Sequence, residues 1–212
     1  MTHHARTERE ALCATLLEVG PDAPTLCTPW STADLAAHLV LRERRPDLAA
    51  GMVISALSGR TDRAMAAMVH DTPYPELVER VRTGPPSWHP TRLPAVDEAV
   101  NLVEMYVHHE DVRRAGAADQ PRRLTREMGE ALGVQLRRMA PLLVRRLHDV
   151  DVQVVTPTRR TSLGRGERPV VEVHGSPAEV LIFLTGRQAV AEVELVGDDA
   201  AVTALCDASL GL

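Results

Sequence analysis

The sequence contains no lysine, so all 24 of its basic residues are arginines, and 29 acidic residues outnumber them. The formal net charge is −5 and the pI is about 6.0. Proteins that bind nucleic acid through its phosphates carry a basic stripe, which this balance does not favour. We therefore expect no nucleic-acid partner.

Long hydrophobic runs are also missing. No apolar stretch approaches the ~18 residues that a membrane helix needs, and the N-terminal residues contain no apolar segment of the kind found in secretory signals. The three cysteines, Cys13, Cys27 and Cys206, are odd in number and widely spaced, which indicates neither a disulfide framework nor a CxxC metal site. We expect a cytoplasmic protein with reduced thiols and no membrane partner.

Aromatic residues make up only 2% of the chain, so its core must be built from Leu, Val, Ala and Met. With 212 residues, the chain is long enough for one ordinary domain and a smaller second one. The sequence does not choose between a monomer and a homodimer.

Helical periodicity dominates the first two-thirds of the chain. A proline-rich connection at 72–94 with one short helix interrupts the pattern, and Pro141 should kink or split the last helix. The sequence predicts helices at 5–19, 31–45, 47–70, 95–115 and 125–148. We interpret residues 1–148 as an all-α bundle.

The pattern changes after residue 148 to alternating valines, which are typical of strands. We expect strands at 150–155, 170–173 and 190–196, a hairpin loop at 159–168, a helix from Pro177 to Gly186 and a last helix at 198–210. Residues 149–212 therefore form a small α+β domain, and the fold class is an α-helical bundle followed by an α+β domain.

Glu104 and His108 could form half of a metal site. Their spacing of four residues places a carboxylate and an imidazole one turn apart on a single helix face. His38, on another helix, lies between Leu35 and Leu41 and should point inward. Three ligands of His and Glu type with an open fourth position are typical of catalytic zinc sites.

Other interpretations of these residues remain open. Residues 97, 101, 104, 108 and 111 share one narrow sector, which on an amphipathic helix is normally the solvent-exposed face. His38 could be a satisfied core histidine, and His109 could replace His108 as a ligand, although it points about 100° away around the helix.

Three separated segments resemble the mycothiol-dependent maleylpyruvate isomerase family. Trp30-Ser-Thr-Ala-Asp34-Leu-Ala-Ala-His38-Leu39 is similar to the W-x-x-x-D-L-x-x-H-L motif of its DinB-like metal-binding bundles, and Glu104-Met-Tyr-Val-His108-His-Glu-Asp111-Val to its E-x-x-x-H-x-x-D-L motif. Val173-His-Gly175-Ser-Pro177 and Leu184-Thr-Gly186-Arg187 resemble the G-x-P and L-x-G-R patterns of its sterol-carrier-like C-terminal domain. The chain resembles shorter, uncharacterised actinobacterial members at least as closely as the isomerase itself.

The resemblance implies a divalent metal, usually zinc, held by His38, Glu104 and His108, with mycothiol as the cosubstrate. The metal would activate the low-molecular-weight thiol as a thiolate, which adds to a small electrophile. In an isomerase the thiol then leaves, and in an S-transferase it stays attached. Asp111 could orient His108 from behind, and the resemblance implies that Arg187 clamps a carboxylate of the substrate or thiol.

Two further functions use the same residues differently. The chain could be a non-catalytic module that binds a small molecule or a protein partner, in which case Glu104 and His108 would lie on an ordinary polar surface. It could also be a hydrolase in which the metal activates water. Burial of Glu104 and His108 separates the module from the two enzymes, and a requirement for thiol separates the enzymes from each other.

Overall fold

The computed structural model describes residues 3–49, 58–116, 120–164 and 166–211. It consists of helices and a four-stranded sheet in two compact units, Met1–Asp119 and Gln120–Leu212. Within the described ranges, no helix is both long and apolar enough to cross a membrane.

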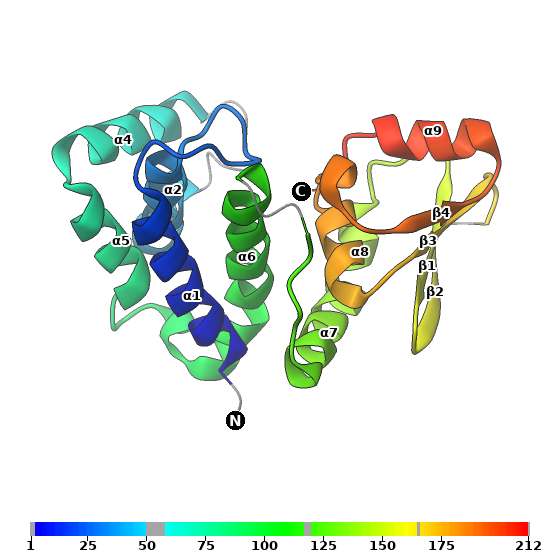
Figure 1. Ribbon diagram of the computed structural model, residues 1–212, viewed down its shortest axis with the longest axis horizontal. Helices are drawn as coiled ribbons and strands as arrows, with labels where there is room; N and C mark the ends of the chain where they lie inside the picture. Colours follow the sequence, from blue (N-terminus) through cyan, green and yellow to red (C-terminus); the bar gives the residue numbers. More distant parts are fainter. Residues whose placement is uncertain (1–2, 50–57, 117–119, 165, 212) are drawn as a thin grey trace. The chain divides into compact units, whose positions relative to one another are not determined.

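The first unit is helical. Its elements are α1 (His4–Val19), α2 (Thr32–Arg44), the single turn α3 (Pro46–Ala49), α4 (Ser58–Asp71), α5 (Tyr74–Thr83), the 3-10 turn η3 (Pro90–Arg92) and α6 (Pro94–Ala115). Helices α1 and α6 lie side by side, and α5 packs on both α1 and α2 (Figure 1). The predicted helix at 47–70 corresponds to α3 and α4, and its residues 50–57 lie outside the described ranges.

Aliphatic side chains from α1, α2, α4, α5 and α6 form one core in this unit. Leu12 and Leu16 contribute from α1, and Leu35 and Leu39 from α2, and all four are fully buried. Trp30, from the loop before α2, is partly buried and packs against this core. Burial of this apolar surface stabilises the helices that carry the candidate metal ligands.

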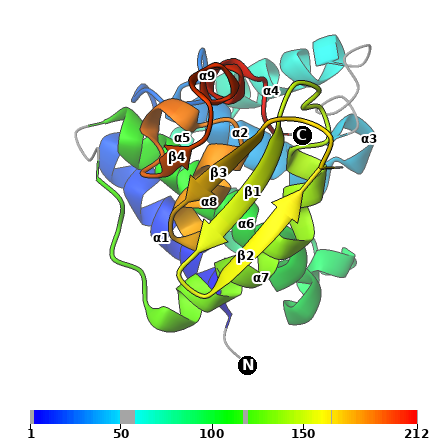
Figure 2. The ribbon, with the colours of Figure 1, turned by 90° about the vertical axis from the view of Figure 1, so that its right-hand side faces the viewer.

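The second unit is built on a sheet of order β2-β1-β3-β4. Its elements are α7 (Arg126–Leu143), β1 (Asp151–Thr156), β2 (Arg159–Leu163), β3 (Val170–His174), α8 (Pro177–Leu184), the 3-10 turn η4 (Gln188–Val190), β4 (Glu194–Val196) and α9 (Asp199–Asp207). Strand β1 runs parallel to β3 and antiparallel to β2, and β4 is antiparallel to β3. Figure 2 looks onto the sheet, with α7 and α8 behind it.

The boundary between the units lies earlier than the expected one at residue 148. Helix α7 packs against α8 and belongs with the sheet, not with the first bundle. The physical reason lies in α8, whose residues Val180–Leu184 are all apolar and buried. Five consecutive residues point to all sides of a helix, so the sheet alone cannot cover them, and α7 covers another side. Pro141 does not split α7, which continues through it and ends at Leu143.

The expected hairpin loop at 159–168 contains a strand. Residues Arg159–Leu163 pair with β1 along the whole of β2. This edge strand was missed because its exposed residues are polar and do not alternate. The loop proper begins at Gly164, where φ is +121° and a Cβ would collide with the Asp151 carboxylate, so the turn requires glycine.

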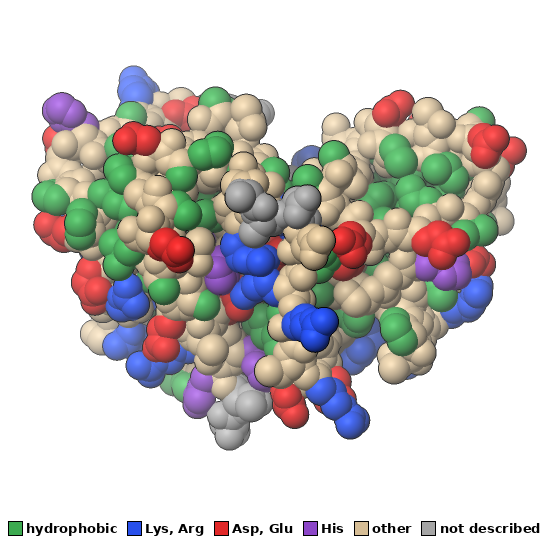
Figure 3. Space-filling model, in the orientation of Figure 1, with side chains coloured by type: hydrophobic (Ala, Val, Ile, Leu, Met, Phe, Trp, Pro, Cys, Tyr) green, Lys and Arg blue, Asp and Glu red, His purple; other side chains and the backbone are tan. Residues whose placement is uncertain are grey.

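The last elements are shorter than expected. Residues 188–190 form the 3-10 turn η4, and only Glu194–Val196 of the predicted strand pairs with β3. Hydrophobic side chains gather between α9 and β4 on the face drawn in Figure 3. Val196, on the short strand, is 45% exposed. Because β4 is only three residues long, this edge offers few backbone groups for pairing with another chain.

Candidate metal centre

Helix α2 begins with a capping box that fixes its first turn. The Ser31 side chain accepts a hydrogen bond from the Asp34 amide, and Asp34 Oδ2 accepts one from the Ser31 amide at 2.9 Å. Asp34 therefore caps the helix. His38 and Arg42 follow at intervals of one turn and share the face that meets α6.

The three predicted ligands come together. His38 Nε2 lies 3.4 Å from Glu104 Oε1, and His108 Nε2 lies 3.3 Å from the same oxygen. One donor atom from each of the three residues lies within 4.8 Å of the others. Two helices distant in sequence thus direct two imidazoles and one carboxylate at a common point.

These distances fit a divalent metal. Bonds of about 2.0–2.1 Å at a tetrahedral angle separate neighbouring nitrogen and oxygen ligands by roughly 3.3 Å. Both His–Glu separations are close to that value. Neutral imidazole and carboxylate are donors that suit zinc, and three protein ligands leave a fourth position open.

Asp111 fixes the ring of His108. The His108 Nδ1 lies 2.9 Å from Asp111 Oδ2, and the Asp111 side chain is fully buried. Because an ionised carboxylate only accepts hydrogen bonds, Nδ1 carries a hydrogen, and Nε2 is the ring nitrogen that a metal would bind in place of a proton. Nε2 is the atom that faces Glu104 and His38, so Asp111 lies where an orienting carboxylate of a metal ligand is found.

The local electrostatics differ between the two histidines. Burial lowers the pKa of His38, even though Glu104 opposes this shift. Burial alone would also lower the pKa of His108, but hydrogen bonds with Asp111, Cys27 and Glu104 hold it well above its usual value. Burial would raise the pKa of Glu104, but His108 and His38 hold it well below the ordinary range. The carboxylate is therefore ionised and available to a cation.

The polar sector of α6 is not a solvent-exposed face. Asn101 and Asp111 are 0% exposed and His108 is 8% exposed, while Glu104 retains partial access to solvent. His38 is buried too, and its Nδ1 has no hydrogen-bond partner among the described residues. His38 is thus not a satisfied core histidine, since a buried polar atom without a partner costs roughly 1–3 kcal/mol.

His109 does not compete for the site. Its Nδ1 lies 2.7 Å from Glu8 Oε1 on α1, and its Nε2 lies 2.9 Å from Thr15 Oγ1. Both ring nitrogens are occupied on the side of α6 that packs against α1. This geometry favours His108 over His109 as the candidate ligand.

Arg42 is a neighbour of the cluster that the sequence analysis missed. Its Nε lies 3.2 Å from Glu104 Oε1, and its Nη1 donates to Asn101 Oδ1 at 2.6 Å. The spacing of four residues after His38 was the available signal, because it places Arg42 on the same helix face. The guanidinium competes with any cation for the Glu104 carboxylate.

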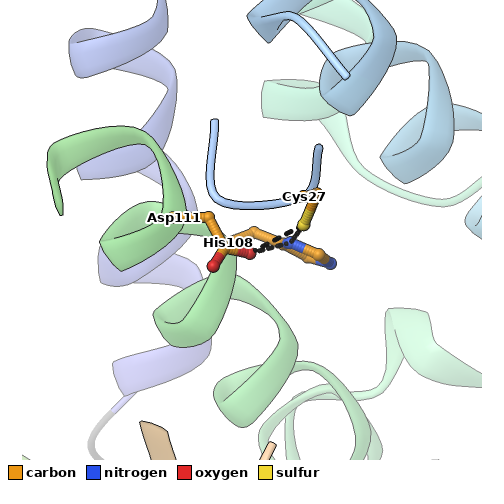
Figure 4. Close-up of side chains that lie close together, drawn as sticks. All are labelled: Cys27, His108 and Asp111. Atoms are coloured by element: carbon orange, nitrogen blue, oxygen red, sulfur yellow. Dashed lines mark hydrogen bonds and ion pairs between the residues drawn. The ribbon is translucent and has the colours of Figure 1, made fainter. Parts of the chain in front are cut away.

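Cys27 is the second neighbour that was missed. The sequence shows no base near it, yet its Sγ lies 3.1 Å from Asp111 Oδ2 and 3.8 Å from His108 Nδ1 (Figure 4). The contact is made by the loop between α1 and α2, and no helical spacing links this loop to α6. Local sequence patterns therefore could not reveal it.

Arg187 belongs to the second unit, where its Nη1 donates to the Thr185 carbonyl oxygen at 2.5 Å. Its assignment as a carboxylate clamp stays a prediction.

The second unit also contains a pocket of about 90 Å³ between α7, α8, β1 and β2. The buried residues Leu136, Ala140 and Val154 and the exposed Arg137 and Arg159 are among those that line it.

Comparisons with known proteins identify no relative of this chain. No family model matches it, and neither the curated proteins nor the solved structures contain a match.

Proposed function

We propose that the first unit binds one divalent metal, most simply zinc, through His38, Glu104 and His108. We further propose that the chain is a cytoplasmic mycothiol-using isomerase or thiol S-transferase that acts on a small electrophile. The observation that carries the proposal is the convergence of three buried or partly buried donor atoms from α2 and α6. The resemblance of three sequence segments adds the thiol, the DinB-like character of the bundle and the sterol-carrier-like character of the second unit.

When bound, the metal supplies Lewis acidity that lowers the pKa of a thiol, so that thiolate is present at neutral pH. The chain's own residues prepare that chemistry. Asp111 accepts the Nδ1 hydrogen of His108, which leaves Nε2 as the nitrogen that would bind a metal. Trp30 packs its ring 4.9 Å from the His38 ring, centroid to centroid, and restricts its rotation.

Arg42 gives the proposed centre a preference for negatively charged substrates. Its guanidinium lies beside Glu104 and retains partial exposure, so it offers a positive charge at the edge of the cluster. Such a charge favours an electrophile that carries a carboxylate. We therefore expect anionic unsaturated acids to be better substrates than neutral analogues.

The deciding experiment measures metal by elemental analysis of tag-free protein after incubation with zinc and removal of excess. We expect about one zinc per wild-type chain, the stoichiometry of a single three-ligand site. Glu104→Gln and His38→Ala should lose it, while His148→Ala, which removes an exposed histidine, should keep it. Zinc retained by both ligand variants would refute the site.

The reaction is tested separately. Unsaturated acids are incubated with zinc-loaded protein, with and without mycothiol, and the products are separated by mass. Isomerisation or thiol adducts that require both mycothiol and Glu104 support the proposal. Hydrolysis that proceeds equally without thiol would replace it with the metal-dependent hydrolase.

A second candidate function rests on the pocket of the second unit. Its apolar floor and two arginines suit a small carboxylic acid with a short apolar body. A thermal-shift screen of such acids, with an Arg137→Gln, Arg159→Gln double variant as the control, tests it. A stabilisation that the double variant abolishes would support binding there, and an equal shift in both proteins would exclude the pocket.

A further inference from the structure

A second group of potential ligands shares His108 with the first. It consists of Cys27, His108 and Asp111, and one donor atom from each lies within 4.8 Å of the others. Figure 4 shows the cysteine reaching from its loop toward the histidine and aspartate of α6. The first group approaches His108 from its Nε2 side, whereas this group approaches from Nδ1.

The loop that carries Cys27 is tied to α6 by its backbone. The Leu26 amide donates to the Asp111 carbonyl oxygen at 3.1 Å, which brings the next residue against the helix. The Cys27 amide donates to Thr25 Oγ1 at 3.2 Å, and the Trp30 amide donates to the Cys27 carbonyl oxygen at 2.9 Å. These contacts hold the backbone at Cys27 against α6, within reach of Asp111 and His108.

The three donor atoms have the spacing of a coordination shell. A tetrahedral ion with one sulfur, one nitrogen and one oxygen ligand separates them by roughly 3.3–3.6 Å. The observed separations are 2.9 Å for His108 to Asp111, 3.1 Å for Cys27 to Asp111 and 3.8 Å for Cys27 to His108. These expected separations are for an ion of zinc's size, which the group would admit if Asp111 moved by about half an ångström, and a larger ion such as Cd²⁺ needs a somewhat larger shift.

We propose that Cys27 Sγ, His108 Nδ1 and the Asp111 carboxylate form an alternative metal position that takes thiophilic ions such as Cd²⁺. Soft ions prefer thiolate, and the first position offers none. On binding, the Cys27 thiol releases its proton to solvent. The Nδ1 proton of His108 is likewise released to solvent, and the neutral ring keeps its hydrogen on Nε2, which faces Glu104 Oε1 at 3.3 Å.

The two positions exclude each other in this scheme. The first requires the hydrogen of His108 on Nδ1, and the second requires it on Nε2, so one neutral ring serves only one ion at a time. Metal identity therefore selects the tautomer of His108 and the set of ligands. The alternative position does not depend on the proposed reaction, because it uses neither His38 nor Glu104 as a ligand.

The test is a Cd²⁺ titration of the reduced full-length chain, followed by the sulfur-to-cadmium charge-transfer absorption in the ultraviolet. We expect one Cd²⁺ per chain and a band that Cys27→Ser abolishes. Cys206→Ser, which removes an exposed thiol, and Glu104→Gln, which removes the first position, should both keep the band. A band that persists in Cys27→Ser, or Cd²⁺ bound without a band in wild type, would overturn the proposal.

Two further measurements exclude a misfolded variant, and binding at the zinc site, as explanations of the result. The ¹¹³Cd NMR shift of the wild-type protein reports sulfur ligation without any variant, and a shift typical of nitrogen and oxygen ligands alone would refute the position. Zinc content of Cys27→Ser should equal that of wild type. Two Cd²⁺ ions bound at once through His108 would refute the exclusion of one position by the other.

Discussion

The two neighbouring histidines of α6 face opposite environments. His109 points toward α1, where Glu8 and Thr15 occupy both of its ring nitrogens. His108 points toward α2 and the loop before it, where Asp111 occupies one nitrogen and the other faces Glu104 and His38. Both rings are buried, so burial alone does not distinguish a structural histidine from a candidate ligand. The partner of Nε2 does distinguish them: in His109 it is a threonine hydroxyl, whereas in His108 it is a carboxylate oxygen that His38 also approaches.

The largest contrast is expected between alanine variants of the two histidines. His108→Ala should lose stoichiometric zinc while keeping the fold. His109→Ala should keep zinc but lower the free energy of unfolding by roughly 1–3 kcal/mol, because a buried hydrogen-bonding partner of Glu8 and Thr15 is removed. Zinc content and urea denaturation measure the two effects. Equal zinc loss in both variants would show that His108 is no more important for zinc binding than His109.

The next effect concerns Asp111, whose carboxylate contacts Nδ1 of His108. Asp111→Asn keeps the size of the side chain but weakens its hold on the Nδ1 hydrogen, so zinc affinity should fall roughly 10–100-fold. Competition with a chromophoric chelator measures this change. Asp34→Asn is the matched control because Asp34 also lies one turn from a ligand, yet its carboxylate caps α2. A loss of affinity as large in the control would show that Asp111 has no special role.

A smaller change in the opposite direction is expected at Arg42. Arg42→Gln removes the cation that lies 3.2 Å from Glu104 Oε1. A partly exposed ion pair is worth about 1 kcal/mol, so zinc affinity should rise about fivefold. Arg45→Gln, which removes an exposed charge that pairs with Asp47, should change little. A weaker affinity in Arg42→Gln would mean that the guanidinium supports the site instead of competing with zinc.

The smallest effect is expected at Cys13, on the helix that supports His109. Burial raises the pKa of this thiol to about 11. A raised pKa keeps the group protonated below that value, so about one molecule in a thousand is thiolate at pH 8. Iodoacetamide at pH 8 should therefore modify the exposed Cys206 and leave Cys13 unmodified until urea unfolds the chain. Mass spectrometry of the alkylated peptides measures this, and early modification of Cys13 would show that the α1 side opens readily.

The parts of the structure that the sequence predicted are those with a strong local period. The spacing of Leu12 and Leu16, and of Glu104 and His108, follows the helical repeat. The convergence of His38 on α6 was implied by a resemblance, and the distances agree with that expectation. Whether zinc or mycothiol binds there stays a prediction.

The parts that were missed depend on contacts between distant segments. Strand β2 exists because β1 offers it a hydrogen-bonding edge, and its own polar residues carry no alternation. Helix α7 has an ordinary amphipathic pattern, which does not specify whether its apolar face meets the first bundle or α8. Cys27 lies 84 positions from Asp111 along the chain, so only the folded loop brings the two together.

Asp111 contacts the Cys27 loop through its backbone and His108 through its side chain, so a change at the His108 ring should also affect the loop. Its carbonyl oxygen holds the Leu26 amide, while its carboxylate contacts both His108 and Cys27. An ion that pulls on the carboxylate would move the same residue that anchors the backbone of the loop. The rate of deuterium exchange at the Leu26 amide would then show which ring nitrogen of His108 binds the ion. The measurement also works for ions, such as zinc, that have no absorption band of their own.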